Sequence, residues 1–319
     1  MLAAVASTTA HGSTTQPGAL PTARAGVNDD SRRRVPASTG TLAFAEALAC
    51  AKRQRSVIAV AHRGRADRSR PENSASGLRA AMRAGAGAME IDLKVTADGV
   101  LVLHHDERLE RTTTASGRPG DTTWEDLSQA FLRHDDGRVA DERPLRLSEA
   151  FAVVPEHLYW LLDIKDASAT TAVLRATIDA GRHRHAAFIA YSIDQAETIR
   201  AFDPGALVAL GTGTRKRLSR IRERGILAPV VGLLGNVATA EKALLRLAGA
   251  RGFFLLGSTY LGDPSIEEVL AGAAGSGVLA QIRPAFTLWV TNNLGVLAPY
   301  LAAIGRSFDR TGCAAGRGA

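Results

Sequence analysis

Apolar runs of strand length alternate along most of the chain with stretches that have the spacing of helices. Uncharged apolar runs of this kind are typical of strands buried on both faces, as in a parallel sheet covered by helices. From residue 56 onward there are eight such runs, at 56–62, 88–95, 158–164, 186–191, 206–211, 230–234, 252–256 and 279–291. Eight strands that alternate with helices predict an α/β fold, a (β/α)8 TIM-type barrel.

The second run continues into a predicted hairpin. Asp98-Gly99 lies between two runs of strand formers, and Asp-Gly is a strong signal for a two-residue turn. With that turn, Asp92 lies directly opposite His105, and Glu90 shares their face because side chains alternate along a strand. We therefore expect these three side chains to converge, although two acids and an imidazole on one face could also be a solvated, salt-bridged strand.

Polar residues also follow the first and third predicted strands. His62-Arg63-Gly64 ends the run at 56–62, and Asp163-Ile-Lys165 ends the run at 158–164. In a barrel, the carboxyl ends of the strands meet at one face, which is where such folds carry their chemistry. The three strand ends are therefore expected to contribute to one site.

The residue types at these strand ends suit a phosphate and a metal ion. Glu90, Asp92 and Asp163 form an all-oxygen set that fits a hard cation such as Mg²⁺ or Ca²⁺. Arg63 can bind two phosphate oxygens in a fork, and Lys165 supplies a point charge. Together these groups would stabilise the charge that builds on a phosphodiester.

Two histidines from different strands complete the expected chemistry. His62 and His105 could flank one phosphorus atom, and histidines near neutral pKa can remove and return protons. His104 is expected to point away from the acids and to be structural. Glu72 could contact the substrate or the ion, or it could begin the following helix with Asn73 and Ser74, which are favoured caps.

An ordered series of motifs resembles the glycerophosphodiester phosphodiesterases over roughly residues 56 to 195. The full series is far more specific than any single motif. It comprises His62-Arg63-Gly64, Pro71-Glu72-Asn73-Ser74, Glu90-Ile-Asp92, Thr96-Ala-Asp98-Gly99, His105-Asp106, Arg111-Thr112-Thr113, Pro144-Leu-Arg-Leu-Ser-Glu149, Asp163-Ile-Lys165 and Ser192-Ile-Asp194.

The resemblance implies metal-dependent hydrolysis of glycerophosphodiesters to an alcohol and sn-glycerol 3-phosphate. It implies acid–base roles for His62 and His105, with the adjacent glycerol hydroxyl attacking first to give a cyclic phosphate that water then opens. Glu72 and Trp289 would bind the substrate beside Arg63 and Lys165, and Trp289 lies in a run similar to the family's Trp-Thr-Val-Asn. Alternatives are a related enzyme for lysophospholipids or sugar phosphodiesters, and a non-catalytic barrel that binds phosphodiesters.

Two segments depart from the repeating pattern. Residues 107–147 contain glycine and proline without strong periodicity, and the resemblance implies a small insertion there, after the hairpin, that caps the barrel mouth. Within it, His134-Asp-Asp-Gly137 is expected to be a turn. The end of the chain, 293–319, lacks the family's final strand, which leaves the closure of the barrel open.

The remaining features limit the partners. Residues 1–40 are rich in small and polar residues and predict a disordered leader before a barrel domain at 41–319, which begins with an amphipathic helix at 41–53. The net charge of +7 favours anionic partners, but no nucleic-acid motif accompanies it.

The chain also lacks an apolar run of the ~18 residues that a membrane helix needs. We expect a cytoplasmic location, or export if a signal precedes the start. Cys50 and Cys313 give neither a disulfide framework nor a zinc-ligand spacing. The oligomeric state and the metal are left open.

Overall fold

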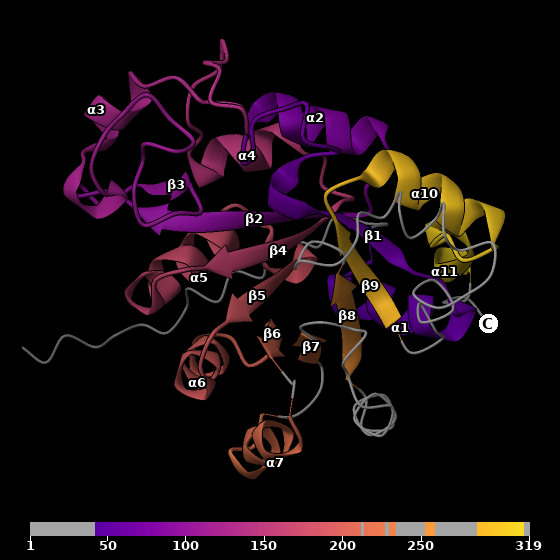
Figure 1. Ribbon diagram of the computed structural model, residues 1–319. Coiled ribbons are helices and arrows are strands. Elements are labelled where there is room, and N and C mark those ends of the chain that lie inside the picture. The colour runs from indigo at the N-terminus through magenta and orange to yellow at the C-terminus, as the bar shows by residue number, and fades with distance from the viewer. Residues whose placement is uncertain (1–41, 212–213, 227–229, 234–252, 259–285, 316–319) are drawn as a thin grey trace, which may run out of the picture. The chain divides into compact units, whose positions relative to one another are not determined.

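Eight parallel strands close into a barrel in the computed structural model (Figure 1), which confirms the predicted fold. The structure describes residues 42–211, 214–226, 230–233, 253–258 and 286–315, so the predicted leader lies outside the described residues. Each of the eight apolar runs overlaps one of the described strands. The strands are β1 Ile58–Ala61, β2 Ala88–Val95, β4 Tyr159–Ile164, β5 Ala186–Ala190, β6 Leu207–Gly211, β7 Val230–Leu233, β8 Phe254–Ser258 and β9 Phe286–Thr291.

Closure of the barrel, which the sequence left open, comes from β9. This strand pairs in parallel with β8 on one side and with β1 on the other, and β1 in turn pairs with β2. After the eighth strand, Ser307 forms an isolated parallel bridge with Val57. The unusual chain end therefore does not have to supply a barrel strand.

Helices between the strands cover the outer face of the barrel (Figure 1), and those that pack on it are α2, α4, α5, α6, α7 and α10. Local capping fixes where several begin; for example, the Ser74 hydroxyl accepts a hydrogen bond from the Gly77 N–H at the start of α2. The helices are α1 Phe44–Gln54, α2 Ala75–Arg83, α3 Trp124–Ser128, α4 Leu147–Val153, α5 Thr170–Asp179, α6 Ile193–Phe202, α7 Arg215–Glu223, α10 Leu294–Ala303 and α11 Arg310–Ala315, with short 3₁₀ helices at His62–Gly64, Pro119–Asp121, Ala167–Ala169 and His183–His185.

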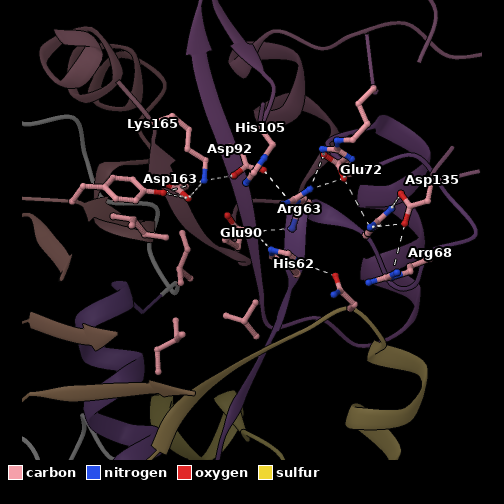
Figure 2. A pocket seen from close by; sticks show the side chains of 18 of the residues that line it. His62, Arg63, Arg68, Glu72, Glu90, Asp92, His105, Asp135, Asp163 and Lys165 are labelled. Carbon is pink, nitrogen blue, oxygen red and sulfur yellow. Dashed lines mark hydrogen bonds and ion pairs between the residues drawn. The ribbon is translucent and has the colours of Figure 1, made fainter. Parts of the chain in front are cut away.

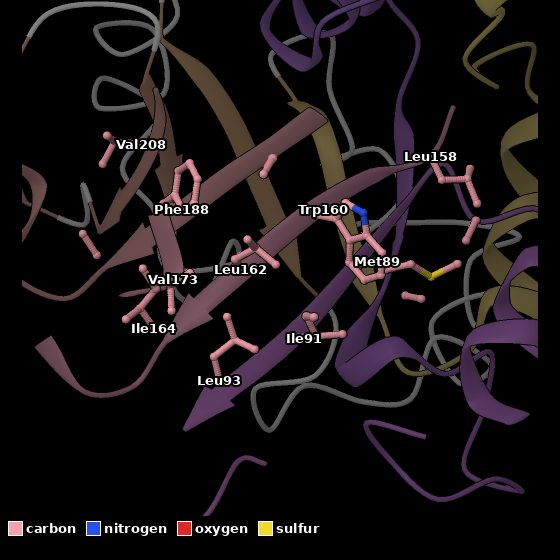
Figure 3. Packing of buried hydrophobic residues seen from close by; sticks show 14 of the residues in the cluster. Met89, Ile91, Leu93, Leu158, Trp160, Leu162, Ile164, Val173, Phe188 and Val208 are labelled. Carbon is pink, nitrogen blue, oxygen red and sulfur yellow. The ribbon is translucent and has the colours of Figure 1, made fainter. Parts of the chain in front are cut away.

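Side chains alternate between two hydrophobic clusters because successive residues of a strand point to opposite faces. Met89, Ile91 and Leu93 of β2 point outward and pack beneath the helices (Figure 3). Inward-facing residues such as Tyr159 pack against α1, where the Phe44 and Tyr159 rings stack with their centroids 4.5 Å apart. The predicted amphipathic helix therefore closes the barrel interior at the amino ends of the strands.

The register of the hairpin differs from the prediction by one residue. Leu93 pairs with Leu103 of β3 (Leu101–Leu103), so the loop has three residues rather than two. The loop takes this form because Gly99 adopts φ +82° and the Thr96 hydroxyl accepts a hydrogen bond from the Val100 N–H. His104, not His105, consequently lies opposite Asp92; the His104 N–H donates to the Asp92 carbonyl at 3.0 Å.

The segment 107–147 packs on its own small hydrophobic cluster, formed by Val102, Leu109, Leu127 and Ala130. His134 to Gly137 forms a turn, as predicted, with Gly137 at φ +84°. Among the described residues, no helix is long and apolar enough to cross a membrane.

A disulfide joins Cys50 of α1 to Cys313 of α11, with their Cα atoms 5.9 Å apart. The two cysteines are 263 residues apart in the sequence, which gave no sign of the pairing. The fold brings them together because the chain returns to α1 after α10. Gln54 at the end of α1 donates a hydrogen bond to the Asp309 carbonyl at 2.9 Å, beside α11.

Candidate active site

A cavity of about 800 Å³ opens at the carboxyl ends of the strands (Figure 2). Side chains from β1, β2, β4 and the hairpin meet there with two from the segment 107–147, Arg111 and Asp135. All but one of the residues singled out from the sequence line it: His62, Arg63, Glu72, Glu90, Asp92, His105, Asp163 and Lys165. The exception is Trp289.

Trp289 lies outside the cavity because of its place in β9. Its neighbours in the strand, Leu288 and Val290, point into the barrel, so Trp289 points outward. It is fully buried there, with its ring 5.5 Å from that of Phe286, and it packs directly over Gly257. Trp289 is therefore a packing residue, and Asn292 at the end of the same run reaches the cavity instead.

Three carboxylates meet at the centre of the cavity. Glu90 and Asp92 are two residues apart in β2, so both side chains lie on its inner face. In the parallel pairing of β2 with β4, Asp92 lies directly beside Asp163. One oxygen from each carboxylate lies within 4.8 Å of the others, and all three side chains are buried. Burial and the charges of Asp92 and Asp163 raise the pKa of Glu90 well above its ordinary value.

The donor set fits a divalent cation. Asp163 Oδ1 is buried and has no hydrogen-bond partner in the part of the chain that the structure describes, so one carboxylate oxygen remains available as a ligand. Burial raises the pKa of Asp163, and a cation among the three carboxylates would relieve the cost of holding them charged together. Oxygen donors alone suit Mg²⁺ or Ca²⁺.

Lys165 supplies the positive charge nearest to this cluster. Its Nζ lies 3.0 Å from Asp92 Oδ1 and 2.6 Å from Asp163 Oδ2. Burial of Asp92 would raise its pKa, but Lys165, His105, the hydrogen bond from Asn73 and Arg63 together outweigh burial, and the pKa is lowered. Asp92 is therefore an anion held against a fixed cation.

Two residues with left-handed backbones hold the carboxylates in place. Asn73, at φ 54°, donates from its amide to Asp92 Oδ2 at 3.0 Å and accepts from the Asp92 N–H at 3.2 Å. Arg63, at φ 52°, donates its backbone N–H to Glu90 Oε2 at 2.7 Å. Such conformations cost energy outside glycine and often occur at functional sites, so the backbone here is shaped around the carboxylates.

Glu72 joins two arginines at the mouth of the cavity. Its buried carboxylate accepts from Arg63 Nη1 at 2.8 and 3.0 Å and from Arg111 Nη2 at 2.7 Å. Burial would raise the pKa of Glu72, but Arg111 and Arg63 outweigh it and the pKa is lowered. Glu72 thus positions both guanidinium groups rather than beginning the helix.

His105 enters the cavity because the chain leaves strand geometry after Leu103. Its Nδ1 lies 2.6 Å from Asp106 Oδ1, and Asp106 is also paired with Arg111. The hydrogen bond from Arg111, followed by that from His105, holds the pKa of Asp106 far below its ordinary value. With Nδ1 occupied by Asp106, Nε2 is the His105 nitrogen available for proton exchange.

His62 directly follows β1, at the start of the short 3₁₀ helix His62–Gly64. Its Nδ1 lies 2.7 Å from Asn292 Oδ1, an oxygen that only accepts, so Nδ1 carries the proton and Nε2 carries the lone pair. Nε2 lies 4.0 Å from Glu90 Oε2. Burial lowers the pKa of His62 to about 4, so the ring is neutral at pH 7.

Tyr191 is a site residue that sequence reasoning missed. Its hydroxyl donates to Asp163 Oδ2 at 2.9 Å and accepts from Lys165 Nζ at 3.0 Å, while 54% of the residue is exposed. Ala187 and Ile189 point into the barrel, and alternation along the strand puts Tyr191, two residues later, on the same side. This alternation could have identified Tyr191 from the sequence.

Comparison with known proteins places this geometry in a family. The chain matches the model of the Glycerophosphoryl diester phosphodiesterase family over residues 62–260. It is 38% identical over 123 residues to mouse glycerophosphodiester phosphodiesterase 1 and 35% identical over 99 residues to a glycerophosphodiester phosphodiesterase from Caldanaerobacter subterraneus. These matches cover 37% and 30% of this chain and 37% and 40% of the two relatives, so they span well under half of each relative.

Solved structures share the fold. A glycerophosphoryl diester phosphodiesterase from Parabacteroides distasonis has a TM-score of 0.72 at 20% identity, over 83% of this chain and 93% of that one. A phosphodiesterase from Oleispira antarctica, solved in complex with the product sn-glycerol-3-phosphate, has a TM-score of 0.61 at 17% identity, over 78% of this chain and 98% of that one. Because the family match spans more than half of its residues, the chain belongs to the glycerophosphoryl diester phosphodiesterase family.

Proposed function

We propose that this protein hydrolyses glycerophosphodiesters to an alcohol and sn-glycerol 3-phosphate, with a divalent cation and with two histidines as the acid–base pair. One observation carries the proposal: His62 and His105, from different strands, line the same cavity as a buried cluster of three carboxylates. A cation held by Glu90, Asp92 and Asp163 would supply charge stabilisation to a phosphate oxygen. The chain's own residues account for the rest of the chemistry.

The arginine and the lysine would hold the phosphate. Arg63 is fixed by Glu72 and Lys165 by two aspartates, so neither has to lose much freedom when substrate arrives. Both present positive charge toward the oxygens on which negative charge builds.

The two histidines are suited to opposite proton transfers. His62, neutral and with its lone pair on Nε2, would accept the proton of the adjacent glycerol hydroxyl as that oxygen attacks phosphorus. His105 would donate a proton from Nε2 to the oxygen of the departing alcohol, while Asp106 stabilises the ring through Nδ1. The resulting cyclic phosphate would be opened by water, with the two proton transfers reversed.

Substitution separates this proposal from a barrel that only binds phosphodiesters. We expect His105→Ala and Asp92→Ala to reduce turnover of glycerophosphoglycerol at least about 100-fold while both variants stay folded. His157→Ala and Asp136→Ala, which change the same residue types at exposed positions outside the cavity, serve as matched controls. Wild-type turnover in either cavity variant, or no turnover in the wild type with any divalent cation, would contradict the proposal.

The disulfide indicates in which cellular compartment the protein acts. Disulfides persist in oxidising environments and are rare in the cytosol. The Cys50–Cys313 bond therefore favours an exported enzyme over the cytoplasmic location that the sequence suggests.

A further inference from the structure

A second cavity, of about 660 Å³, lies beside the active-site cavity. It is formed by the start of α6 and by one face of α7, and we call it the basic pocket after the side chains of Lys216, Arg217, Arg220 and Arg224 that line it. Tyr191 lines both cavities. The two spaces are therefore neighbours that share one exposed aromatic side chain.

Arg217 stands at the junction of the two cavities. Its Nη2 donates to the Tyr191 carbonyl at 2.8 Å, which fixes the guanidinium. A Cβ placed on Gly211, which lines the active-site cavity, would be in ordinary van der Waals contact with Arg217, 3.7 Å from its Cζ. Arg217 therefore lies close to the wall of the active-site cavity.

The charge of the basic pocket is only partly neutralised. Arg224 pairs with Asp194 at 3.0 Å and also with Glu197. Lys216 and Arg220 are exposed and make no ion pair with any residue that the structure describes. They lie four residues apart on the same face of α7, where like charges repel, so their placement does not stabilise the helix.

Tyr191 connects this charge to the reacting centre. Its hydroxyl bonds to Asp163 Oδ2 and Lys165 Nζ, and the same residue lines the basic pocket. Because Tyr191 lines both cavities, one ester arm of a phosphodiester whose phosphate lies beside Asp163 would extend along Tyr191 toward the basic pocket. An anionic group on that arm would meet Lys216 and Arg220, which make no ion pair with a described residue. Hydrogen bonds between oppositely charged groups are stronger than those between neutral groups.

We propose that the basic pocket binds a second anionic group, a phosphate or a carboxylate, on the alcohol arm of the diester, and so selects alcohols that carry one. This specificity rests on the proposed phosphodiesterase function. It separates substrates with an anionic alcohol arm from those with a cationic one such as choline, which the same charges repel.

The test compares two substrates that differ only in the second anion: glycerophosphoglycerol and the same diester with a phosphate on its terminal hydroxyl. We expect wild-type kcat/KM to be at least about 10-fold higher for the phosphorylated substrate. The double variant K216A/R220A is expected to lose that advantage and to keep its rate on glycerophosphoglycerol within about twofold. Arg222→Ala, an exposed cation on α7 outside the pocket, should change neither rate.

A second measurement reads the basic pocket without turnover. Calorimetry with inorganic phosphate and no added metal should show binding to the wild type and to R222A, weakened at least about 10-fold in K216A/R220A. If no diester is hydrolysed, the phosphodiesterase function fails, while phosphate binding still tests the pocket.

Three results would overturn the specificity. One is an equal loss of rate on both substrates, and another is an R222A effect as large as that of the double variant, which would indicate general electrostatic steering. The third is no preference between the substrates together with weaker binding of K216A/R220A to anionic phospholipid vesicles, which would make α7 a membrane contact.

Discussion

Removal of the disulfide tests how far one bond stabilises the closed barrel. The double variant C50S/C313S leaves the rest of the sequence intact. The bond closes a loop with a sequence separation of 263 residues. The chain-entropy relation for a loop of that size gives about 5–6 kcal/mol at 25 °C. Measured disulfides seldom exceed about 5 kcal/mol, and the buried contacts of Phe44 and Leu48 hold α1 in place without it.

We therefore expect a loss of about 3–5 kcal/mol, or a fall in melting temperature of roughly 6–20 °C. Urea unfolding followed by circular dichroism, with and without reductant, measures this loss. Reductant should lower the wild-type midpoint to that of the variant and leave the variant unchanged. A wild-type midpoint that does not respond to reductant, in protein whose thiols are then shown to be free, would refute the reasoning.

Three further variants test packing, the arginine network and proton transfer. Gly257→Ala would place a Cβ 2.5 Å from Trp289 Cζ3, so we expect the free energy of unfolding in urea to fall by about 1–3 kcal/mol with KM unchanged. A raised KM would indicate that Trp289 contributes to substrate binding. The pKa of Glu72 is lowered in the folded state, so its charge stabilises the fold at pH values above the unfolded-state pKa of about 4.3. This stabilisation is lost as the pH falls from there through the folded-state pKa. Glu72→Gln should therefore be less stable at pH 7 and lose less stability than the wild type on acidification below the unfolded-state pKa, and parallel acid unfolding curves would argue against this. Asp106→Asn should lower kcat roughly 100-fold with little change in KM, because Asp106 acts through His105, and an effect on KM alone would contradict that role.

The barrel and most of its site were predictable because alternation along strands is local information. Glu90 and Asp92 are two residues apart, so any strand there brings them to one face, and Asp163 follows from the same pattern one strand later. The same rule puts Trp289 outside the cavity and Tyr191 inside it, but it was not applied to these two residues. The resemblance at the Trp289 motif favoured the opposite assignment.

The hairpin shows where local signals are too coarse. Asp98-Gly99 correctly marked a turn, but the loop length depends on the hydrogen bond that the Thr96 hydroxyl accepts from the Val100 N–H, and a change of one residue reverses which side chains share a face. His105 reaches the cavity by leaving the strand, so the predicted position was right although the predicted pairing was wrong.

Long-range pairings were beyond sequence reasoning. The Cys50–Cys313 bond and the contact between His62 and Asn292 join residues 263 and 230 positions apart. Arg111 belonged to the motif series, but its pairing with buried Glu72 depends on how the segment 107–147 folds and brings Arg111 to the cavity. Only the closed barrel brings these partners together.

Metal-dependent product formation tests the central claim most directly. Enzyme stripped with EDTA and dialysed is mixed with glycerophosphoglycerol, and sn-glycerol 3-phosphate is followed by phosphorus NMR before and after Mg²⁺ or Ca²⁺ is restored. We predict no product from the stripped enzyme, product after restoration, and none from Asp163→Asn, which alters one of the three clustered carboxylates. Full turnover by the stripped enzyme, or undiminished turnover by Asp163→Asn, would contradict the account.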